Sequence, residues 1–189
     1  MNRCDWCVHS QIEIDYHDNE WGVPLYDDRK LFEFLILDTF QAGLSWRTIL
    51  NKRENFRQAF DSFNPIIIAK YSNDKFFELM NDNGIIRNKM KIEAAIINSQ
   101  KFIEIKEKYS SFSNYIWSFS DGQIILNSNV KMKDVSTKNI ISDKMSSDMK
   151  KFGFKFVGTT ICYAFMQAMG MVNDHLLDCY RYPELINNY

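Results

Sequence analysis

The chain has 189 residues, of which 46% are hydrophobic and 15% aromatic, so it can build a core and global disorder is excluded. No apolar run approaches the roughly 20 residues that a membrane span requires, and the polar N-terminus (Asn2, Arg3) excludes a signal peptide. The net charge of −1 does not indicate a nucleic-acid binder, although a local basic face would suffice for phosphate contacts. We therefore expect a cytoplasmic protein with no membrane segment, built as one domain over residues 1–189 with two closely packed lobes.

Helical patterns run through most of the chain, and Gly and Pro are scarce. Caps and apolar periodicity predict seven helices. The first is started by Asp27-Asp28, covers Leu31 to Asp38 and is ended by Gly43. The others cover about 45–62, 73–82, 88–108, 142–151 (capped by Ser142), 159–169 and 174–179. The polar stretch 119–140 predicts a loop with a short strand. Sustained alternation of apolar and polar residues is lacking, so the expected fold class is all-α.

Soft metal ligands gather near both ends of the chain. His175 and Cys179 are four apart and would share one face of a helix, which is a common spacing for two zinc ligands. The N-terminal segment offers Cys4, Cys7, His9 and His17. On spacing alone Cys4 with Cys7 is slightly favoured, and Cys4 with His17 is the rival. Cys162, inside an apolar helix, is interpreted as a buried structural thiol.

Asp38 is an acid on the apolar face of the first predicted helix, seven residues after Leu31 and four after Phe34. A carboxylate there is desolvated, which is costly unless the group is paired, and which favours a functional site. The competing interpretation is a structural carboxylate bonded to backbone amides or to a buried Arg. The following stretch "QAGLSW" (41–46) predicts a turn at Gly43 with Leu44 exposed at its tip and Trp46 behind it. This stretch fits equally a wedge beside a pocket and an ordinary helix–turn–helix corner with Trp46 in the core.

The stretch "NDNGIIRNKMKI" (81–92) joins two predicted helices through a turn at Gly84. Free amides at a helix start, assisted by Arg87 or Lys91, favour anion binding. Contacts of this kind position a protein on DNA without reading sequence. As a bare pattern, an αα-hairpin of this type is common.

Several long blocks together resemble one known family. They are "YHDNEWG" (16–22), "QAGLSW" (41–46), "KRENFRQAF" (52–60), "GIIRNKMKI" (84–92), "GFKFVGTTICYAFMQAMG" (153–170) and "VNDHLLDC" (172–179). The chain is identified as similar to bacterial DNA-3-methyladenine glycosylase I, with matching residues from Cys4 to Cys179. The resemblance implies a helix-hairpin-helix DNA glycosylase fold that acts on double-stranded DNA with alkylated bases, as a monomer and without strand cleavage.

The resemblance also implies roles for individual residues. One structural zinc would be held by Cys4, His17, His175 and Cys179, joining the two terminal segments and leaving Cys7 aside. Asp38 would be catalytic, in a base pocket with Tyr16, Trp46, Trp6 and Trp21. The DNA contacts would come from Gly43, Leu44, Gly84, Ile85, Arg87 and Lys91, with Leu44 filling the gap left by a flipped nucleotide.

This chain departs from the family at Asp38, where the family carries Glu. Asp is shorter by one C–C bond, about 1.5 Å. Phe40, close behind it, either pushes the helix inward and restores the reach of the acid or narrows the pocket. Three outcomes stay open at this point: retained release of 3-methyladenine, a drifted base preference, or a damaged-DNA-binding module that flips the base without cleavage.

Overall fold

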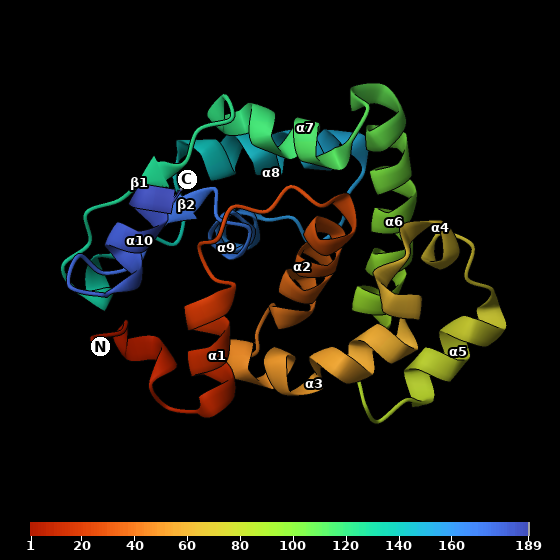
Figure 1. Cartoon of the computed structure of the whole chain (residues 1–189). Coiled ribbons are helices and arrows are strands. Elements are labelled where there is room, and N and C mark those ends of the chain that lie inside the picture. Colours follow the sequence, from red (N-terminus) through yellow and green to blue (C-terminus); the bar gives the residue numbers. More distant parts are fainter. Residues whose placement is uncertain (189) are drawn as a thin grey trace.

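The computed structural model describes residues 1–188, and within them the fold is almost entirely helical (Figure 1). The helices are α1 (Gln11–Asn19), α2 (Asp28–Gln41), α3 (Trp46–Ala59), α4 (Pro65–Ile68), α5 (Asn73–Asn81), α6 (Lys89–Tyr109), α7 (Phe112–Trp117), α8 (Ile140–Phe152), α9 (Thr159–Ala168) and α10 (Arg181–Asn188). Short 3-10 turns occur at Asp5–Cys7, Asp61–Phe63, Ser118–Ser120 and Met132–Asp134. Two strands of two residues, β1 (Ile125–Leu126) and β2 (Val172–Asn173), pair in parallel.

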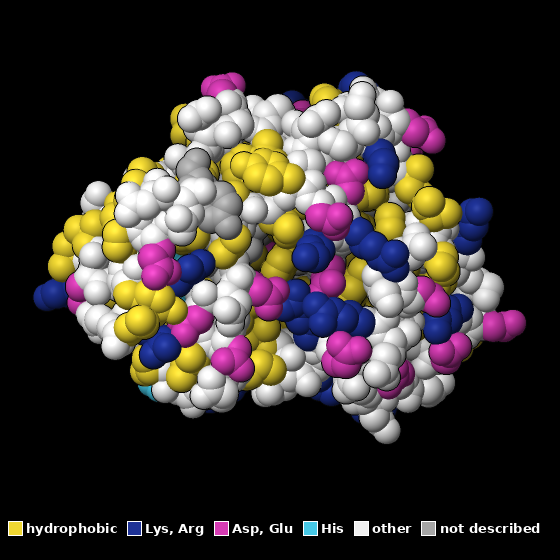
Figure 2. Space-filling model, viewed as in Figure 1, with side chains coloured by type: hydrophobic (Ala, Val, Ile, Leu, Met, Phe, Trp, Pro, Cys, Tyr) yellow, Lys and Arg dark blue, Asp and Glu magenta, His cyan; other side chains and the backbone are white. Residues whose placement is uncertain are grey.

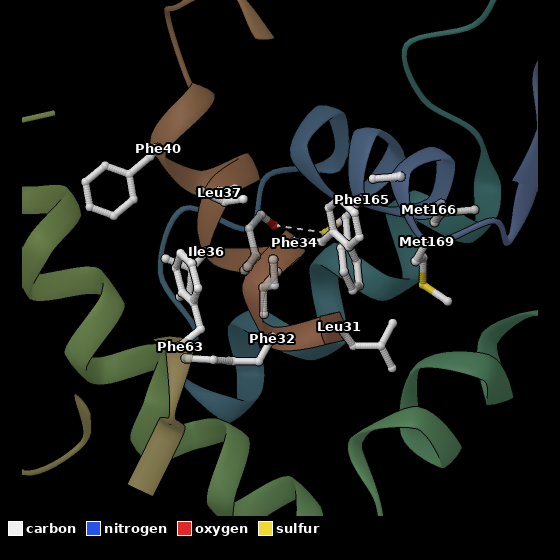
Figure 3. Packing of buried hydrophobic residues seen from close by; sticks show 14 of the residues in the cluster. Leu31, Phe32, Phe34, Ile36, Leu37, Phe40, Phe63, Phe165, Met166 and Met169 are labelled. Carbon is white, nitrogen blue, oxygen red and sulfur yellow. Dashed lines mark hydrogen bonds between the residues drawn. The ribbon is translucent and has the colours of Figure 1, made fainter. Parts of the chain in front are cut away.

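Helix α2 lies at the centre of the core. Its ten residues from Leu31 to Phe40 are all buried, so it is covered on every side. Figure 3 shows Phe165, Met166 and Met169 on one side of it and Phe63 on another. The Asp27 side chain accepts from the Lys30 amide at 2.8 Å and caps its start, as the sequence predicts.

The N-terminal segment lies beside residues 178–180 near the other end of the chain. The Tyr180 amide donates to the Asn2 carbonyl at 3.1 Å, and the Asn2 side chain donates to Asp178 at 2.7 Å. Both terminal labels fall on the same side of the molecule in Figure 1. Residues separated by most of the sequence therefore share one small region, where a metal site can form.

One predicted helix does not form, and two predicted helix boundaries are wrong, each for a local reason. Residues 174–179 form a turn and not a helix, because the Cys179 amide bonds to Leu176, three residues earlier. Helix α8 is capped by Asn139, and Ser142 lies one turn inside as its capping-box partner. Helix α3 ends at Ala59, and Ser62, with a φ of +51°, cannot continue it.

Charges on the surface are paired more than they are segregated. Arg53 donates to Glu20 at 2.8 Å and to Glu33 at 2.6 Å, and Arg57 adds a second contact to Glu33 at 2.8 Å. Figure 2 shows basic side chains mixed with acidic ones near the centre of one face, over α2 and α3. Across residues 1–188, helices that combine the length and the apolar character needed to cross a bilayer are lacking.

Candidate active site and metal cluster

Four residues from the two ends of the chain converge on one point. The ligand atoms of Cys4, His17, His175 and Cys179 all lie within 4.8 Å of one another, and all four residues are buried. The Cys179 sulfur lies 3.5 Å from His17 Nε2 and 3.5 Å from His175 Nδ1. Two thiols and two imidazoles at this separation match the donor set of a closed, four-coordinate zinc site.

Neighbouring groups select which ring nitrogen each histidine offers. His17 Nδ1 is 2.8 Å from an Asp18 carboxylate oxygen, which can only accept, so Nδ1 carries the proton and Nε2 is free to bind a metal. His175 Nε2 is 3.1 Å from the Trp21 carbonyl, so Nδ1 is the free nitrogen. Arg3 holds Asp18 through two hydrogen bonds of 2.8 and 3.0 Å. Both free nitrogens face the cluster, so these residues fit a metal.

The structure separates the alternatives that spacing left open. The Cys7 thiol donates to the Cys4 carbonyl at 3.1 Å and takes no part in the cluster, so the preference for a Cys4–Cys7 pair was wrong. His9 is also outside it. Cys162 is buried, and its thiol points to the Val157 carbonyl at 3.6 Å, in line with a structural role. His175 and Cys179 meet through a turn instead of a helix.

A pocket of about 370 Å³ lies beside these four cysteine and histidine residues (Cys4, His17, His175 and Cys179), which we call the metal cluster. This volume is within the range of about 300–1,000 Å³ that small-ligand sites have. Its lining combines the five residues expected in a base pocket with ten others: Trp6, Tyr16, Trp21, Asp38, Trp46, Gln41, Met132, Val135, Ser136, Thr137, Thr160, Tyr163, Ala164, Gln167 and Ala168.

The aromatic residues form continuous walls of this pocket. The Tyr16 and Trp46 rings lie 5.2 Å apart between centroids, tilted by 53°. Trp6 meets the Trp21 ring edge to face at 5.1 Å. Tyr16 is carried by α1, directly before the metal-cluster residue His17, and Trp46 is the first residue of α3. The walls therefore offer flat surfaces on which a planar ligand can stack.

Asp38 brings an uncompensated carboxyl group into this pocket. It is 2% exposed, and its Oδ2 atom has no hydrogen-bond partner among residues 1–188. Trp46 Nε1 is also buried without a partner. Desolvation by burial raises the pKa of Asp38, and burial with the Asp38 charge nearby raises that of Tyr16. Buried polar groups normally find partners, so the two unpartnered atoms are free to bond to a ligand that enters this pocket.

Phe40 does not line the pocket. Its ring points into the core, 4.8 Å from the Phe56 ring and 5.7 Å from that of Phe60, and it is absent from the pocket lining. The expected narrowing of the pocket by Phe40 was therefore wrong, whereas the expected inward push on the helix, which would act from this core side, stays a prediction. The pocket residue next along α2 is Gln41, one turn after Asp38 on the same face.

Sequence reasoning missed one wall of the pocket. That wall combines α9, which carries Tyr163 and Gln167, with the loop around Met132 to Thr137. Buried Asp174 joins α9 to the segment that precedes this loop, because it accepts hydrogen bonds of 2.7–2.8 Å from Asn127, Asn129, Tyr163 and Gln167. The block 153–170 contained a usable signal, because Thr160, Ala164 and Gln167 recur at helical spacing.

The expected DNA-contacting residues lie on two adjacent segments. Gly43, with a φ of +80°, turns the chain after α2, and Leu44 follows with 40% of its surface exposed. Gly84 and Ile85 lie between α5 and α6, where Ile85 buries its side chain. Arg87 is exposed in the same turn.

Lys91 has a different environment from the one its basic cluster suggested. It is 5% exposed, and its Nζ atom donates to the Phe40 and Ala42 carbonyls at 2.8 and 2.6 Å. Its ammonium group is therefore directed into the protein and is not available for the phosphate contact expected from the sequence.

Comparison with known proteins gives the same picture from independent evidence. Residues 6–182 match the family model described as methyladenine glycosylase. The chain is 45% identical to DNA-3-methyladenine glycosylase 1 of Escherichia coli (strain K12) over 183 residues, covering 97% of this chain and 98% of the relative. Among solved structures, a crystal structure of 3-methyladenine DNA glycosylase I has a TM-score of 0.94 at 47% identity, over 96% of this chain and 100% of that one. A tyrosine-to-phenylalanine variant of 3-methyladenine DNA glycosylase I in complex with 3-methyladenine has a TM-score of 0.93 at 34% identity, over 97% and 98% of the chains. The chain belongs to the methyladenine glycosylase family.

Proposed function

We propose that this chain repairs alkylated DNA by flipping 3-methyladenine into the pocket of Tyr16, Asp38 and Trp46 and hydrolysing its N-glycosidic bond there. The chain is an enzyme of the DNA-3-methyladenine glycosylase class. The observation that carries the residue-level proposal is the pair of buried, unpartnered atoms, Asp38 Oδ2 and Trp46 Nε1, in one aromatic pocket. The exocyclic amine of a flat, cationic base supplies the donor that Asp38 Oδ2 lacks, and the Trp46 ring beside it offers a face on which such a base can stack.

Each pocket residue has a defined task in this proposal. Trp46 stacks on the base, with cation–π attraction to its positive charge. Asp38 accepts a hydrogen bond from the exocyclic amine, which selects adenine-like edges. Tyr16 hydrogen-bonds to the ring, and Trp6 and Trp21 add to the aromatic side of the pocket opposite the α9 wall. The positive base also favours the ionised form of Asp38, against the effect of burial on its pKa.

The chemical step needs little acid catalysis. Methylation at N3 leaves the base positively charged, so when the bond between N9 and the sugar C1′ breaks, the bonding electrons neutralise the leaving base. A water molecule adds to C1′ and loses its proton to solvent. Asp38 stabilises the positive charge that the base shares with the sugar in the transition state. A lysine nucleophile is not part of this route, so the strand stays intact.

The DNA contacts follow from the two exposed segments. Leu44 enters the duplex where the nucleotide has left, with Gly43 supplying the turn behind it. Among residues 1–188, the Ile85 and Arg87 amides donate to no backbone carbonyl, so the Gly84 turn can hold a phosphate, assisted by the Arg87 side chain. In this proposal the partner is double-stranded DNA, which the protein meets in the cytoplasm. The protein acts as a monomer, with residues 1–189 forming one domain of two helical lobes.

The metal in this proposal is a structural zinc held by Cys4, His17, His175 and Cys179. With four protein ligands it has no open position, so it does not activate water. It fastens the N-terminal segment, which carries Tyr16, to the C-terminal segment. Its binding free energy therefore contributes to the stability of the fold.

The test is release of free 3-methyladenine from methylated duplex DNA by the purified chain, beside its Asp38→Glu variant. Release by the natural chain supports the proposal and means that the pocket works with the shorter acid. If only the Glu variant releases base, the proposal fails for this chain. Duplex binding without release would then indicate a damage-binding module, and release of a different methylated base would indicate drifted specificity.

A further inference from the structure

Lys91 connects the Gly84 turn to the segment that carries the catalytic acid. It lies in the first turn of α6, directly after that turn, and its ammonium group bonds to the Phe40 and Ala42 carbonyls at the end of α2. The last carbonyls of a helix lack partners within the helix, and a cation is favourable at that end. Lys91 therefore holds the point where the chain leaves Asp38 and turns toward Leu44.

Lys52 makes a similar connection in the opposite direction. It belongs to α3, which begins at Trp46, and its Nζ atom donates to the Asn83 and Gly84 carbonyls at 3.0 and 3.1 Å. Asn55, one turn later, donates to the same Gly84 carbonyl at 3.3 Å. The approach is close, because a Cβ atom added to Gly84 would lie 3.1 Å from the Asn55 Cβ.

These contacts join two segments that we define as the wedge loop (residues 40–45) and the hairpin turn (residues 82–88). Carbonyl oxygens of the wedge loop accept hydrogen bonds from Lys91, which lies on the helix that follows the hairpin turn. Carbonyl oxygens of the hairpin turn accept hydrogen bonds from Lys52, which lies on the helix that follows the wedge loop. Burying a charged group is weak evidence for stability, because its desolvation offsets much of the gain. A paired arrangement of this kind does, however, fix one segment relative to the other.

We propose that Lys52 and Lys91 are positioning residues that lock the wedge loop to the hairpin turn, so that seating the turn on a phosphate sets how deeply Leu44 enters the duplex. This inference rests on the proposed function for its DNA step. The rigid coupling of the two segments is a separate property that can be measured without DNA.

Amide hydrogen exchange tests the coupling directly. The variants are Lys91→Met and Lys52→Met, which keep the side-chain length and remove the charge. The matched control is Lys89→Met, because Lys89 is exposed beside the same turn and reaches only Glu93, at 3.8 Å. We expect either clamp variant to accelerate exchange in both segments, and the control in neither. If each variant loosens only the segment whose carbonyls it loses, the lysines are separate local caps and the proposal is wrong.

Excision kinetics test the consequence for DNA. Under single-turnover conditions at saturating protein, the clamp variants should slow excision from methylated duplex by on the order of 10- to 100-fold, the effect of a misplacement of about 1 Å. Excision from methylated single strands, which have no gap for Leu44 to fill, should keep the wild-type rate, as should duplex excision by the Lys89→Met control.

The comparison of duplex with single-stranded substrate separates positioning from stability, and an unchanged rate on both overturns the proposal. A duplex-specific loss supports the clamp, whereas an equal loss on both substrates assigns the lysines to fold stability alone and overturns it. If Lys91→Met does not fold, Lys52→Met decides, since its side chain is partly exposed and its loss leaves the core intact. If the natural chain excises from neither substrate, the proposed function fails, and the exchange experiment still decides on the clamp.

Discussion

Replacing Asp38 by Asn should make the protein more stable and less active at the same time. The substitution nearly preserves shape but removes a buried charge whose Oδ2 atom has no partner. An unsatisfied buried group costs about 1–3 kcal/mol, and more when it is charged. Because Asn leaves a neutral polar atom unpaired at the same place, we expect a gain of about 1 kcal/mol. For a chain of this size that corresponds to a rise in Tm of roughly 2–4 °C.

The gain in stability of the Asp38→Asn variant should increase as the pH rises. Burial raises the pKa of Asp38 in the folded protein above its value in the unfolded chain, about 3.9. The folded state therefore binds this proton more tightly, and the contribution of Asp38 to stability is lost as the pH rises through the raised pKa. The difference in Tm between the variant and the natural protein should grow from acid to neutral pH. Acid effects on the metal cluster are common to both proteins and cancel in this difference.

Thermal melts at several pH values, together with release of free base, measure both effects. A matched control is Asp174→Asn, the same change at a buried carboxylate that accepts four hydrogen bonds. That variant should lose about 1.5–3 kcal/mol, since hydrogen bonds to a charged group are lost. For Asp38→Asn, base release should fall on the order of 100-fold. A lowered Tm at neutral pH, or unchanged release, would refute the reasoning.

Three other substitutions probe the metal cluster, the wedge loop and the packing. The natural protein should contain about one zinc per chain by elemental analysis, and Cys179→Ser should lose the metal and melt at a lower temperature; a variant with full zinc and stability would contradict the assigned ligand set. Leu44→Ala should slow excision from duplex but not from single strands, and equal rates on duplex would remove its wedge role. Gly170→Ala should lower stability by more than about 1 kcal/mol in denaturant unfolding, because φ is +74° there and a Cβ atom would overlap the Val23 backbone.

Sequence reasoning was most accurate where a local signal fixed the structure. The cap at Asp27-Asp28 and the apolar run from Leu31 to Asp38 predicted α2, and the helix predicted at about 88–108 matches α6 within one residue at each end. Helices α1 and α10 were missed because their apolar positions are few and their burial depends on distant parts of the chain. Short helices of this kind are marginal alone and form through tertiary packing.

The candidate site also combines features that local sequence reveals with features that depend on contacts between distant residues. The spacing of soft ligands and the acid on an apolar face were visible locally, and the family resemblance added the pairing of Cys4 with His17. The α9 wall left a helical signal in the sequence that was overlooked, whereas the place of the loop at residues 132–137 in the pocket depends on long-range packing that no local signal shows. Lys91 was misinterpreted as a phosphate contact because its acceptors lie 51 and 49 residues away in sequence. A charge cluster in one dimension does not reveal which of its members fold inward.

The metal cluster and the base pocket share a structural connection. His175 donates to the Trp21 carbonyl, and Trp21 lines the pocket. Asp174, the residue before His175, holds Tyr163 and Gln167 on the opposite wall through hydrogen bonds of 2.8 and 2.7 Å. Since His17 follows Tyr16 in α1, three sides of the pocket are fixed by residues at or beside the ligands. In the proposed function, a zinc held by these four residues would not touch the base, yet it would help to set the shape of the pocket that receives it.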